Sequence, residues 1–157
     1  MTNTGTVYCI DACSIIYFFD HFPKDIFNTL HDRVSDLLDQ RRLLVHRLVK
    51  SEIAHWNVDA YAWCQSVPDR NLIDIDNEQG KFISRLELEL PDYAAQFTHV
   101  EYQTKADPFL VACGHNHGFT VVTEEKNKPA RIPFLCDHFG VDCIKLFDMF
   151  REEAWQF

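Results

Sequence analysis

Four acidic residues occupy positions where a parallel sheet would bring their carboxylates together. Asp11 directly follows an apolar segment typical of a short buried strand, and Glu125 follows the strand-like segment "FTVVT" at 119–123. Asp107 begins a helical segment that leads into that strand, and Glu52 lies near the start of another helical segment. Because functional groups of parallel α/β sheets gather at the carboxyl ends of the strands, we expect the four side chains to converge there.

Carboxylates held close together favour a divalent cation between them. Like charges a few ångströms apart raise one another's pKa, and a cation removes that penalty. Mg²⁺ and Mn²⁺ prefer hard oxygen ligands, and a metal held in this way activates water and offsets charge on a phosphodiester. Asp11 is the most informative of the four, because a charged residue between apolar neighbours is rarely just solvated. The pattern indicates Mg²⁺- or Mn²⁺-dependent hydrolysis.

Each acid also has an ordinary explanation, which the sequence leaves open. Asp107 and Pro108 form a favourable N-cap and N1 pair for a helix. Glu52 taken alone is typical of a solvated helix residue, and Glu124 or Glu125 of a loop acid. Capping does not exclude metal ligation. The sequence does not decide whether Glu124 or Glu125 is the ligand.

The elements around these acids alternate between strand and helix. A first strand ends near Ile10, and the segment 24–40 has an apolar helical face. A helix over 47–64, a strand over 71–75 and a helix over 77–90 that Pro91 stops come next. A variable stretch runs to about residue 102, before the helix and strand within 105–125, the polar loop 126–133, a short helix, a strand over 142–147 and a terminal helix. The face of the helix 24–40 comprises Ile26, Phe27, Leu30, Val34, Leu37 and Leu38. This order predicts an α/β fold with a mainly parallel sheet.

Length and composition predict one domain over residues 1–157. The chain has 157 residues, 46% of them hydrophobic, enough for a single core. Its apolar runs are far shorter than the roughly 18 residues of a membrane span, and its start lacks a signal pattern. Six cysteines without a regular framework indicate a reducing compartment. We therefore expect a cytoplasmic protein without membrane contact.

Charge excludes one class of function and leaves another open. The net charge of −9 argues against a general nucleic-acid coat, whose affinity comes from Lys and Arg. It is compatible with a nuclease, whose metal-binding acids are themselves negative. Basic residues adjoin two of the acids in sequence and are candidate contacts to RNA phosphates, although a solvated face is the default interpretation. These are Arg41, Arg42, Lys126, Lys128 and Arg131.

Other motifs carry less weight. A set of Cys and His residues suggests zinc, but its spacing matches no standard finger. The set is Cys113, His115, His117, Cys136, His138 and Cys143. Dinucleotide, NTPase, serine-hydrolase and zincin signatures do not occur in the sequence. Cys13, two residues after the first acid, counts against a phosphotransfer enzyme of the haloacid-dehalogenase type, which has a second acid at that place.

Five motifs together resemble the PIN-domain nucleases, and more closely a PIN-like family of bacteria and archaea long catalogued as a domain of unknown function. They are "YCIDACSII", "KSEIAHW", "KADPFLVACG", "FTVVTEEK" and "RIPFLCDHFGVDCIKLFDMFR", and they span nearly the whole chain. The resemblance implies a three-layer α/β/α fold and Mg²⁺- or Mn²⁺-dependent hydrolysis of RNA. It also implies a similarity to VapC-type toxins, so an antitoxin and a second copy of the chain join RNA as candidate partners. A non-catalytic scaffold that binds RNA or a protein is the alternative.

The resemblance assigns the site residue by residue. It implies Asp11, Glu52, Asp107 and Glu125 as catalytic and metal-binding residues, with Thr123 matching the family's threonine. Ser14 and Glu124 are supporting candidates. Two positions depart from the pattern. Cys13 stands where the family often has a hydroxyl or amide residue, and Glu125 stands where PIN nucleases commonly have Asp, although the closer PIN-like family uses Glu.

Overall fold

A parallel five-stranded sheet forms the centre of the computed structural model, which describes residues 5–95, 105–129 and 131–157. The strand order is β3-β2-β1-β4-β5, and every pair of neighbours is parallel. The expected parallel α/β sheet is thus confirmed, while residues 96–102 of the variable stretch lie outside the described part. The strands are β1 (Tyr8–Ile10), β2 (Leu43–His46), β3 (Leu72–Ile73), β4 (Thr120–Val122) and β5 (Cys143–Ile144).

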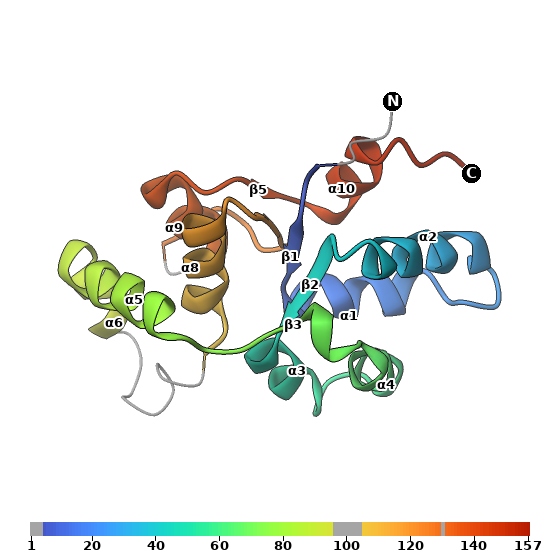
Figure 1. The fold of residues 1–157 in the computed structure, drawn as a ribbon, viewed down its shortest axis with the longest axis horizontal. Coiled ribbons are helices and arrows are strands. Elements are labelled where there is room, and N and C mark those ends of the chain that lie inside the picture. Colours follow the sequence, from blue (N-terminus) through green and yellow to red (C-terminus); the bar gives the residue numbers. More distant parts are fainter. Residues whose placement is uncertain (1–4, 96–104, 130) are drawn as a thin grey trace.

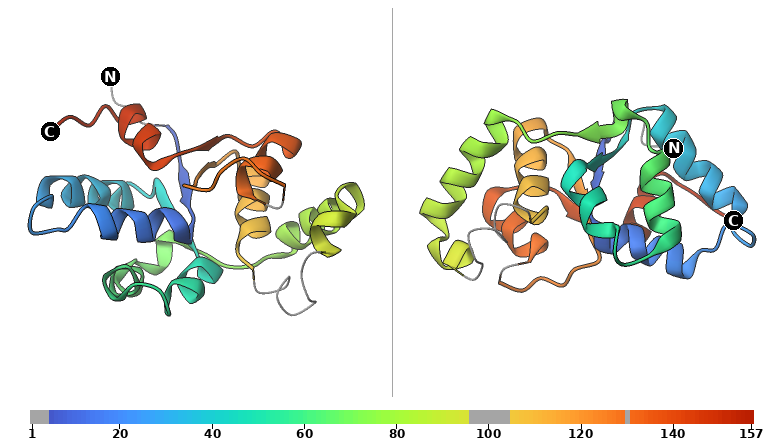
Figure 2. Two further views of the ribbon diagram at one scale, coloured as in Figure 1. Left: turned by 180° about the vertical axis from the view of Figure 1, so that it is seen from behind. Right: turned by 90° about the horizontal axis from the view of Figure 1, so that it is seen from below.

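Helices cover both faces of this sheet and complete the expected three layers. One side carries α1 to α4, and the other carries α5, α6, α8 and α9 (Figure 1). The two turned views in Figure 2 show the same separation. The bounds are α1 (Ala12–His21), α2 (Asn28–Asp39), α3 (Arg47–Ile53), α4 (Val58–Ser66), α5 (Asn77–Glu89), α6 (Pro91–Ala95), α8 (Asp107–His117), α9 (Ile132–Phe139) and α10 (Leu146–Glu152), with a 3-10 turn at Asp69–Asn71. In the described ranges, no helix is both long enough and apolar enough to cross a membrane.

Burial on both faces explains why the strands consist of apolar residues. Cys9, Val45 and Val121 are fully buried on three neighbouring strands. This is the pattern expected where helices cover both sides of a parallel sheet. β1 and β4 run in register from Tyr8 beside Thr120 to Ile10 beside Val122, so the two strands end level with each other. The residues that follow these two strands therefore emerge side by side.

One expected helix is divided in the structure, and another ends where the sequence predicts. The segment 47–64 forms two helices, because Asn57 starts α4 as an N-cap whose side chain accepts a hydrogen bond from the Ala60 N–H at 2.9 Å. The helix α5 ends at Glu89, just before Pro91, as expected, and Pro91 is the first residue of the separate short helix α6, where proline is well tolerated. The division into α3 and α4 comes from a local helix-start signal that overrode the apolar period.

The second strand and the start of α2 also differ from expectation. β2 occupies Leu43–His46, a short apolar segment between basic residues for which no strand was expected. α2 begins only at Asn28, so Ile26 and Phe27 precede it and remain 70% and 38% exposed. The other four members of the expected face are buried: Leu30, Val34, Leu37 and Leu38.

Candidate functional site

Asp11 lies at the carboxyl end of β1, where its backbone N–H donates to the Val122 carbonyl at 3.0 Å. The side chain is 2% exposed and caps α1: Oδ1 accepts the Ser14 N–H at 2.7 Å and Oδ2 accepts the Thr123 hydroxyl at 2.5 Å. Burial raises the pKa of Asp11 to about 7, although these hydrogen bonds oppose the shift. Asp11 is therefore a buried carboxyl in a fixed orientation, and its hydrogen bonds do not fully offset the cost of burying its negative charge.

Glu125 lies two residues beyond β4 and is linked to Asp11 through Thr123. The Glu125 backbone N–H donates to Thr123 Oγ1 at 3.1 Å, and its Oε2 accepts the Ile132 N–H at 3.3 Å. Burial, followed by the negative charge of Asp107, raises the pKa of Glu125 to about 7. One hydroxyl thus positions two of the four predicted acids.

Asp107 is the first residue of α8, and the structure contradicts its expected capping role. Ala106 is the N-cap, and no side chain caps this end of the helix. The Asp107 side chain is buried, which raises its pKa, while the Lys105 ammonium at 3.6 Å from Oδ2 lowers it. Sequence reasoning missed Lys105, although a cation two residues before the acid of "KADP" was a visible signal. The Asp107 carboxylate therefore interacts with Lys105 and Glu125 and does not cap α8.

Glu52 reaches the site from α3. Its Oε1 accepts the Ala106 N–H at 2.8 Å, so Glu52 joins α3 to the start of α8. Burial raises the pKa of this half-buried carboxyl, and the charge of Asp107 adds to the effect. Glu52 is therefore not a solvated helix residue.

The four acids form a line of neighbours in the order Glu52, Asp107, Glu125 and Asp11. Charge effects link each adjacent pair. Within the described ranges, no three His, Cys, Asp or Glu side chains are grouped closely enough to hold a metal ion. The donor set, all carboxylate oxygens with raised pKa values, is nevertheless the type that Mg²⁺ and Mn²⁺ prefer. The residues thus fit a divalent cation in the chemistry of their donor atoms, while their present spacing does not form a metal-binding group among the described residues.

Glu124 and Cys13 lie beside this line with different roles. The Glu124 carboxylate is directed to α10, where Oε1 accepts the Leu146 N–H at 2.8 Å. Glu125, not Glu124, is therefore the neighbour of Asp11 and Asp107. Burial and then the charge of Asp11 raise the pKa of the Cys13 thiol to about 12, which keeps it uncharged. Ser14 supplies the backbone N–H to Asp11, while its hydroxyl donates to the Val122 carbonyl at 3.3 Å.

Two of the five candidate phosphate contacts do not lie at this edge. Arg42 precedes β2 at its amino end, where it is buried and pairs with Glu153 through Nη2 and Oε2 at 2.5 Å. Arg41 is exposed in the turn just before it, with φ of 58°. The expectation that these arginines contact RNA beside the acids is therefore corrected, because the intervening strand carries them to the opposite end of the sheet.

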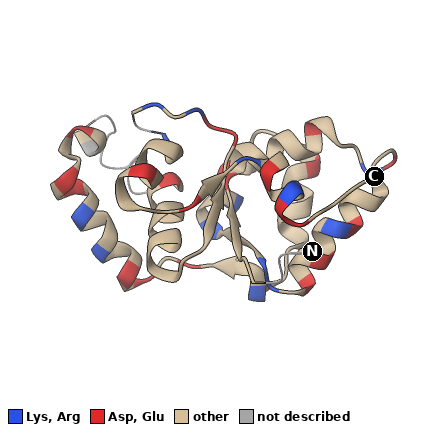
Figure 3. Cartoon of the chain, turned by 90° about the horizontal axis from the view of Figure 1, so that it is seen from above, with Lys and Arg blue, Asp and Glu red and all other residues tan. Residues whose placement is uncertain are grey.

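The other three candidates follow Glu125 directly. Lys126, Lys128 and Arg131 are exposed in the loop between β4 and α9. The charge of Arg131 lowers the pKa of both Asp107 and Glu125, which places it near the acids. In Figure 3 this loop passes from acidic to basic colouring as it leaves the sheet.

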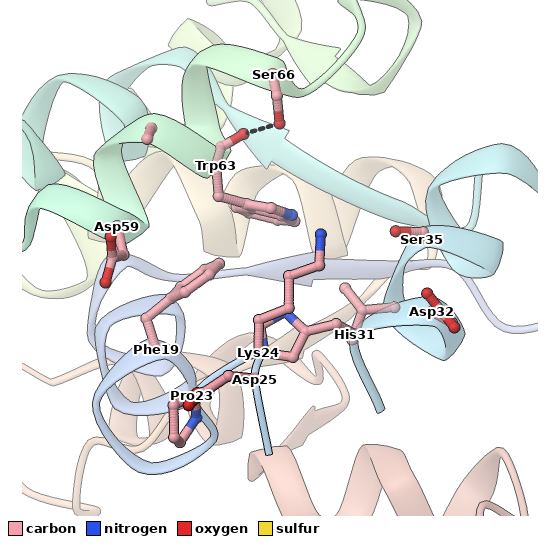
Figure 4. Close-up of a pocket in the computed structure, with 12 residues that line it drawn as sticks. Phe19, Pro23, Lys24, Asp25, His31, Asp32, Ser35, Asp59, Trp63 and Ser66 are labelled. Atoms are coloured by element: carbon pink, nitrogen blue, oxygen red, sulfur yellow. Dashed lines mark hydrogen bonds between the residues drawn. The ribbon is translucent and has the colours of Figure 1, made fainter. Parts of the chain in front are cut away.

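A cavity outside the acidic site lies on the side of the sheet that carries α1, α2 and α4. It encloses about 550 Å³ between α1, α2 and α4, with Phe19, Lys24, His31 and Trp63 among its walls (Figure 4). None of the four predicted acids lines it. The volume of a cavity therefore does not identify the acidic site in this protein.

Fold and site together define a three-layer α/β protein with a line of partly buried carboxylates at the carboxyl edge of its sheet. A comparison with family models matches residues 8–157 to the family described as "Domain of unknown function (DUF4411)", and the chain belongs to that family. A search of curated proteins found no match.

Proposed function

We propose that the chain is a Mg²⁺- or Mn²⁺-dependent endoribonuclease of the PIN-like type. The observation that carries this proposal is the buried Asp11 carboxyl, fixed by two hydrogen bonds and followed along the sheet edge by Glu125 and Asp107. Burying acids without full compensation is costly, and perturbed pKa values of this kind cluster at functional sites. The resemblance of the surrounding motifs to PIN nucleases supports the same conclusion.

The residues have separate tasks in this proposal. Asp11, Asp107 and Glu125 hold the cation, and Glu52 is a further ligand or orients the attacking water. A bound Mg²⁺ or Mn²⁺ supplies water activation and offsets the charge that develops on the phosphodiester. Thr123 and the Ser14 N–H keep the Asp11 carboxylate in one orientation. Lys105 and Arg131 place positive charge next to Asp107, where an anionic substrate would approach.

The biological role proposed for this activity rests on resemblance. We propose a cytoplasmic toxin of a toxin–antitoxin pair, with an antitoxin protein and a homodimer as candidate assemblies. The similarity of the motifs to VapC-type toxins supports this role.

A cleavage assay tests the nuclease proposal. A mixed RNA substrate is incubated with wild type in Mn²⁺ and in chelator, alongside Asp107→Asn and the matched control Asp36→Asn, which changes an exposed residue of α2. We expect cleavage by wild type and by the control in Mn²⁺ only, and none by Asp107→Asn. Cleavage that persists in chelator or in folded Asp107→Asn would contradict the assignment.

One observation favours the alternative, a PIN-like scaffold without catalysis. Among the described residues the acids are not grouped closely enough to hold a metal ion, and Glu125 Oε2 already accepts the Ile132 N–H. Thermal unfolding separates the two functions, since a cation that binds only the folded chain raises its stability by RT ln(1 + [L]/Kd). The nuclease proposal predicts a higher melting temperature in Mn²⁺. The scaffold alternative predicts no shift and no cleavage.

A further inference from the structure

A cleft of about 400 Å³ opens beside the acidic edge. The loop after β4, the start of α9, the end of β5 and the start of α10 line it. Thr123 and Glu125 belong to its walls, so the cleft is continuous with the candidate site. Its volume falls within the range of about 300–1,000 Å³ that is usual for small-ligand pockets. Its volume is sufficient for a nucleotide.

Lys145 enters this cleft from a position equivalent to that of Asp11. The Thr123 N–H donates to the Ile144 carbonyl at 2.9 Å, so Lys145 follows β5 as Asp11 follows β1. In the sheet order β1-β4-β5 the two residues are separated by two strand spacings, on the order of 10 Å along the edge. The bond from the Leu146 N–H to Glu124 fixes the Lys145 segment against the loop after β4. A strand of nucleic acid at the acids would pass Lys145.

The two aspartates in the cleft wall each accept a hydrogen bond from a neighbouring side chain. Asp137 Oδ2 accepts a hydrogen bond from Asn127 Nδ2 at 3.1 Å, and Asp148 Oδ1 accepts one from Arg151 Nη1 at 3.0 Å. By contrast, the ammonium groups of Lys126 and Lys145 form no ion pair with any residue that the structure describes.

The remaining walls suit a nucleotide as well. Pro133 and Ile144 are half-buried and give the cleft apolar surface. Such surface can pack against a sugar or a base, while ammonium groups contact the phosphates on either side. The cleft therefore combines the ammonium groups of Lys126 and Lys145 with an apolar wall, and its lining also includes the carboxylates of Glu125, Asp137 and Asp148.

We propose that this cleft is a subsite for single-stranded RNA, in which Lys126 and Lys145 bind the phosphates that flank the reacting one. The inference rests on the proposed nuclease function and assigns its substrate as a single strand. It adds Lys145, which the sequence did not single out, as a substrate-positioning residue. The RNA then leaves the acids over β4 and β5, not over β2.

The salt dependence of RNA binding tests this subsite without requiring cleavage. Binding of a fluorescent single-stranded oligoribonucleotide is measured in chelator over a range of salt for wild type, Lys126→Gln and Lys145→Gln. Each lost phosphate contact on a single strand lowers the log–log salt slope by about 0.7. The control Lys24→Gln removes the same charge in the cavity between α1, α2 and α4, far from the acids, and should leave the slope unchanged.

Kinetics provide a second readout in Mn²⁺. We expect both lysine variants to raise KM for RNA several-fold with kcat close to wild type, and a duplex of the same sequence to compete poorly. Unchanged slopes in both variants, or a wild type that binds no RNA, would overturn the subsite. If the slopes change as expected but wild type cleaves no RNA, the subsite stands and the nuclease proposal falls.

Discussion

Thr123 joins the two central acids of the site through a single hydroxyl. Its Oγ1 donates to Asp11 Oδ2 and accepts the Glu125 N–H. Thr123→Val removes the donor to a buried carboxyl, so we predict a loss of about 1–3 kcal/mol in the free energy of unfolding. Urea denaturation measures this loss. Thr123→Ser, which keeps the hydroxyl, should lose much less, and equal stability of the two variants would contradict the role of the hydrogen bond.

Asp11 makes the stability of the fold depend on pH. Its pKa rises from 3.8 in the unfolded chain to about 7 in the folded one, so the folded state binds more protons between these values. Stability from this group is present below pH of about 4 and is lost as pH rises to about 7. Asp11→Asn removes the titration.

Denaturation curves of both proteins in chelator test this dependence. We predict that wild type loses stability relative to Asp11→Asn across that window, and that the difference levels off above it. A difference that stays constant with pH would show that Asp11 ionises normally. Metal affinity should rise over the same window, because ligands must lose their protons.

At the scale of elements, Gly114 sets how closely α8 approaches its neighbours. A Cβ at this position would collide with Val141 Cγ1 and lie 3.1 Å from the Phe119 carbonyl oxygen. Gly114→Ala would push α8 outward, and with it Asp107 at the start of the helix. We predict a loss of about 1–3 kcal/mol in the free energy of unfolding, measured by urea denaturation. Gly80→Ala on α5, where a Cβ meets nothing within 4 Å, is the matched control and should not destabilise the protein.

Glu153, the residue that follows α10, connects the end of this helix to the amino end of the sheet. Its Oε2 accepts hydrogen bonds from Arg42 Nη2 at 2.5 Å and from the Tyr8 hydroxyl at 2.6 Å. Arg42→Ala leaves the buried Glu153 charge without its partner, so we predict a loss of about 3–5 kcal/mol in the free energy of unfolding. RNA affinity of the folded fraction should match wild type. A drop in affinity without loss of stability would restore Arg42 as a phosphate contact.

Elements with a complete local signal were predictable, and those decided by tertiary packing were not. The helix 77–90 combines apolar period, Asp76 as N-cap and a defined end, and it forms at Asn77–Glu89. β2 has only four residues beside charged neighbours, so pairing with β1 and not local pattern makes it a strand. Missing β2 is also why Arg41 and Arg42 were expected at the wrong end of the sheet.

At the scale of the whole molecule, the sheet edge was predictable while the side-chain directions were not. Because β1 and β4 are parallel neighbours, Asp11 and the loop after β4 lie at the same edge of the sheet, and the order of strands and helices in the sequence is enough to predict this. Which of Glu124 and Glu125 faces the acids depends on α10, whose first N–H binds Glu124. That contact joins residues far apart in sequence, so no local pattern reports it.

A comparison of Glu125→Gln with Glu124→Gln tests the central claim most directly. The two positions are adjacent and undergo the same chemical change, but only Glu125 belongs to the line of acids. We predict that Glu125→Gln loses Mn²⁺ binding, measured by calorimetry, and Mn²⁺-dependent RNA cleavage. Glu124→Gln should keep both, since its amide oxygen can still accept the Leu146 N–H. Loss of both properties in Glu124→Gln with retention in Glu125→Gln would contradict the site described for this protein.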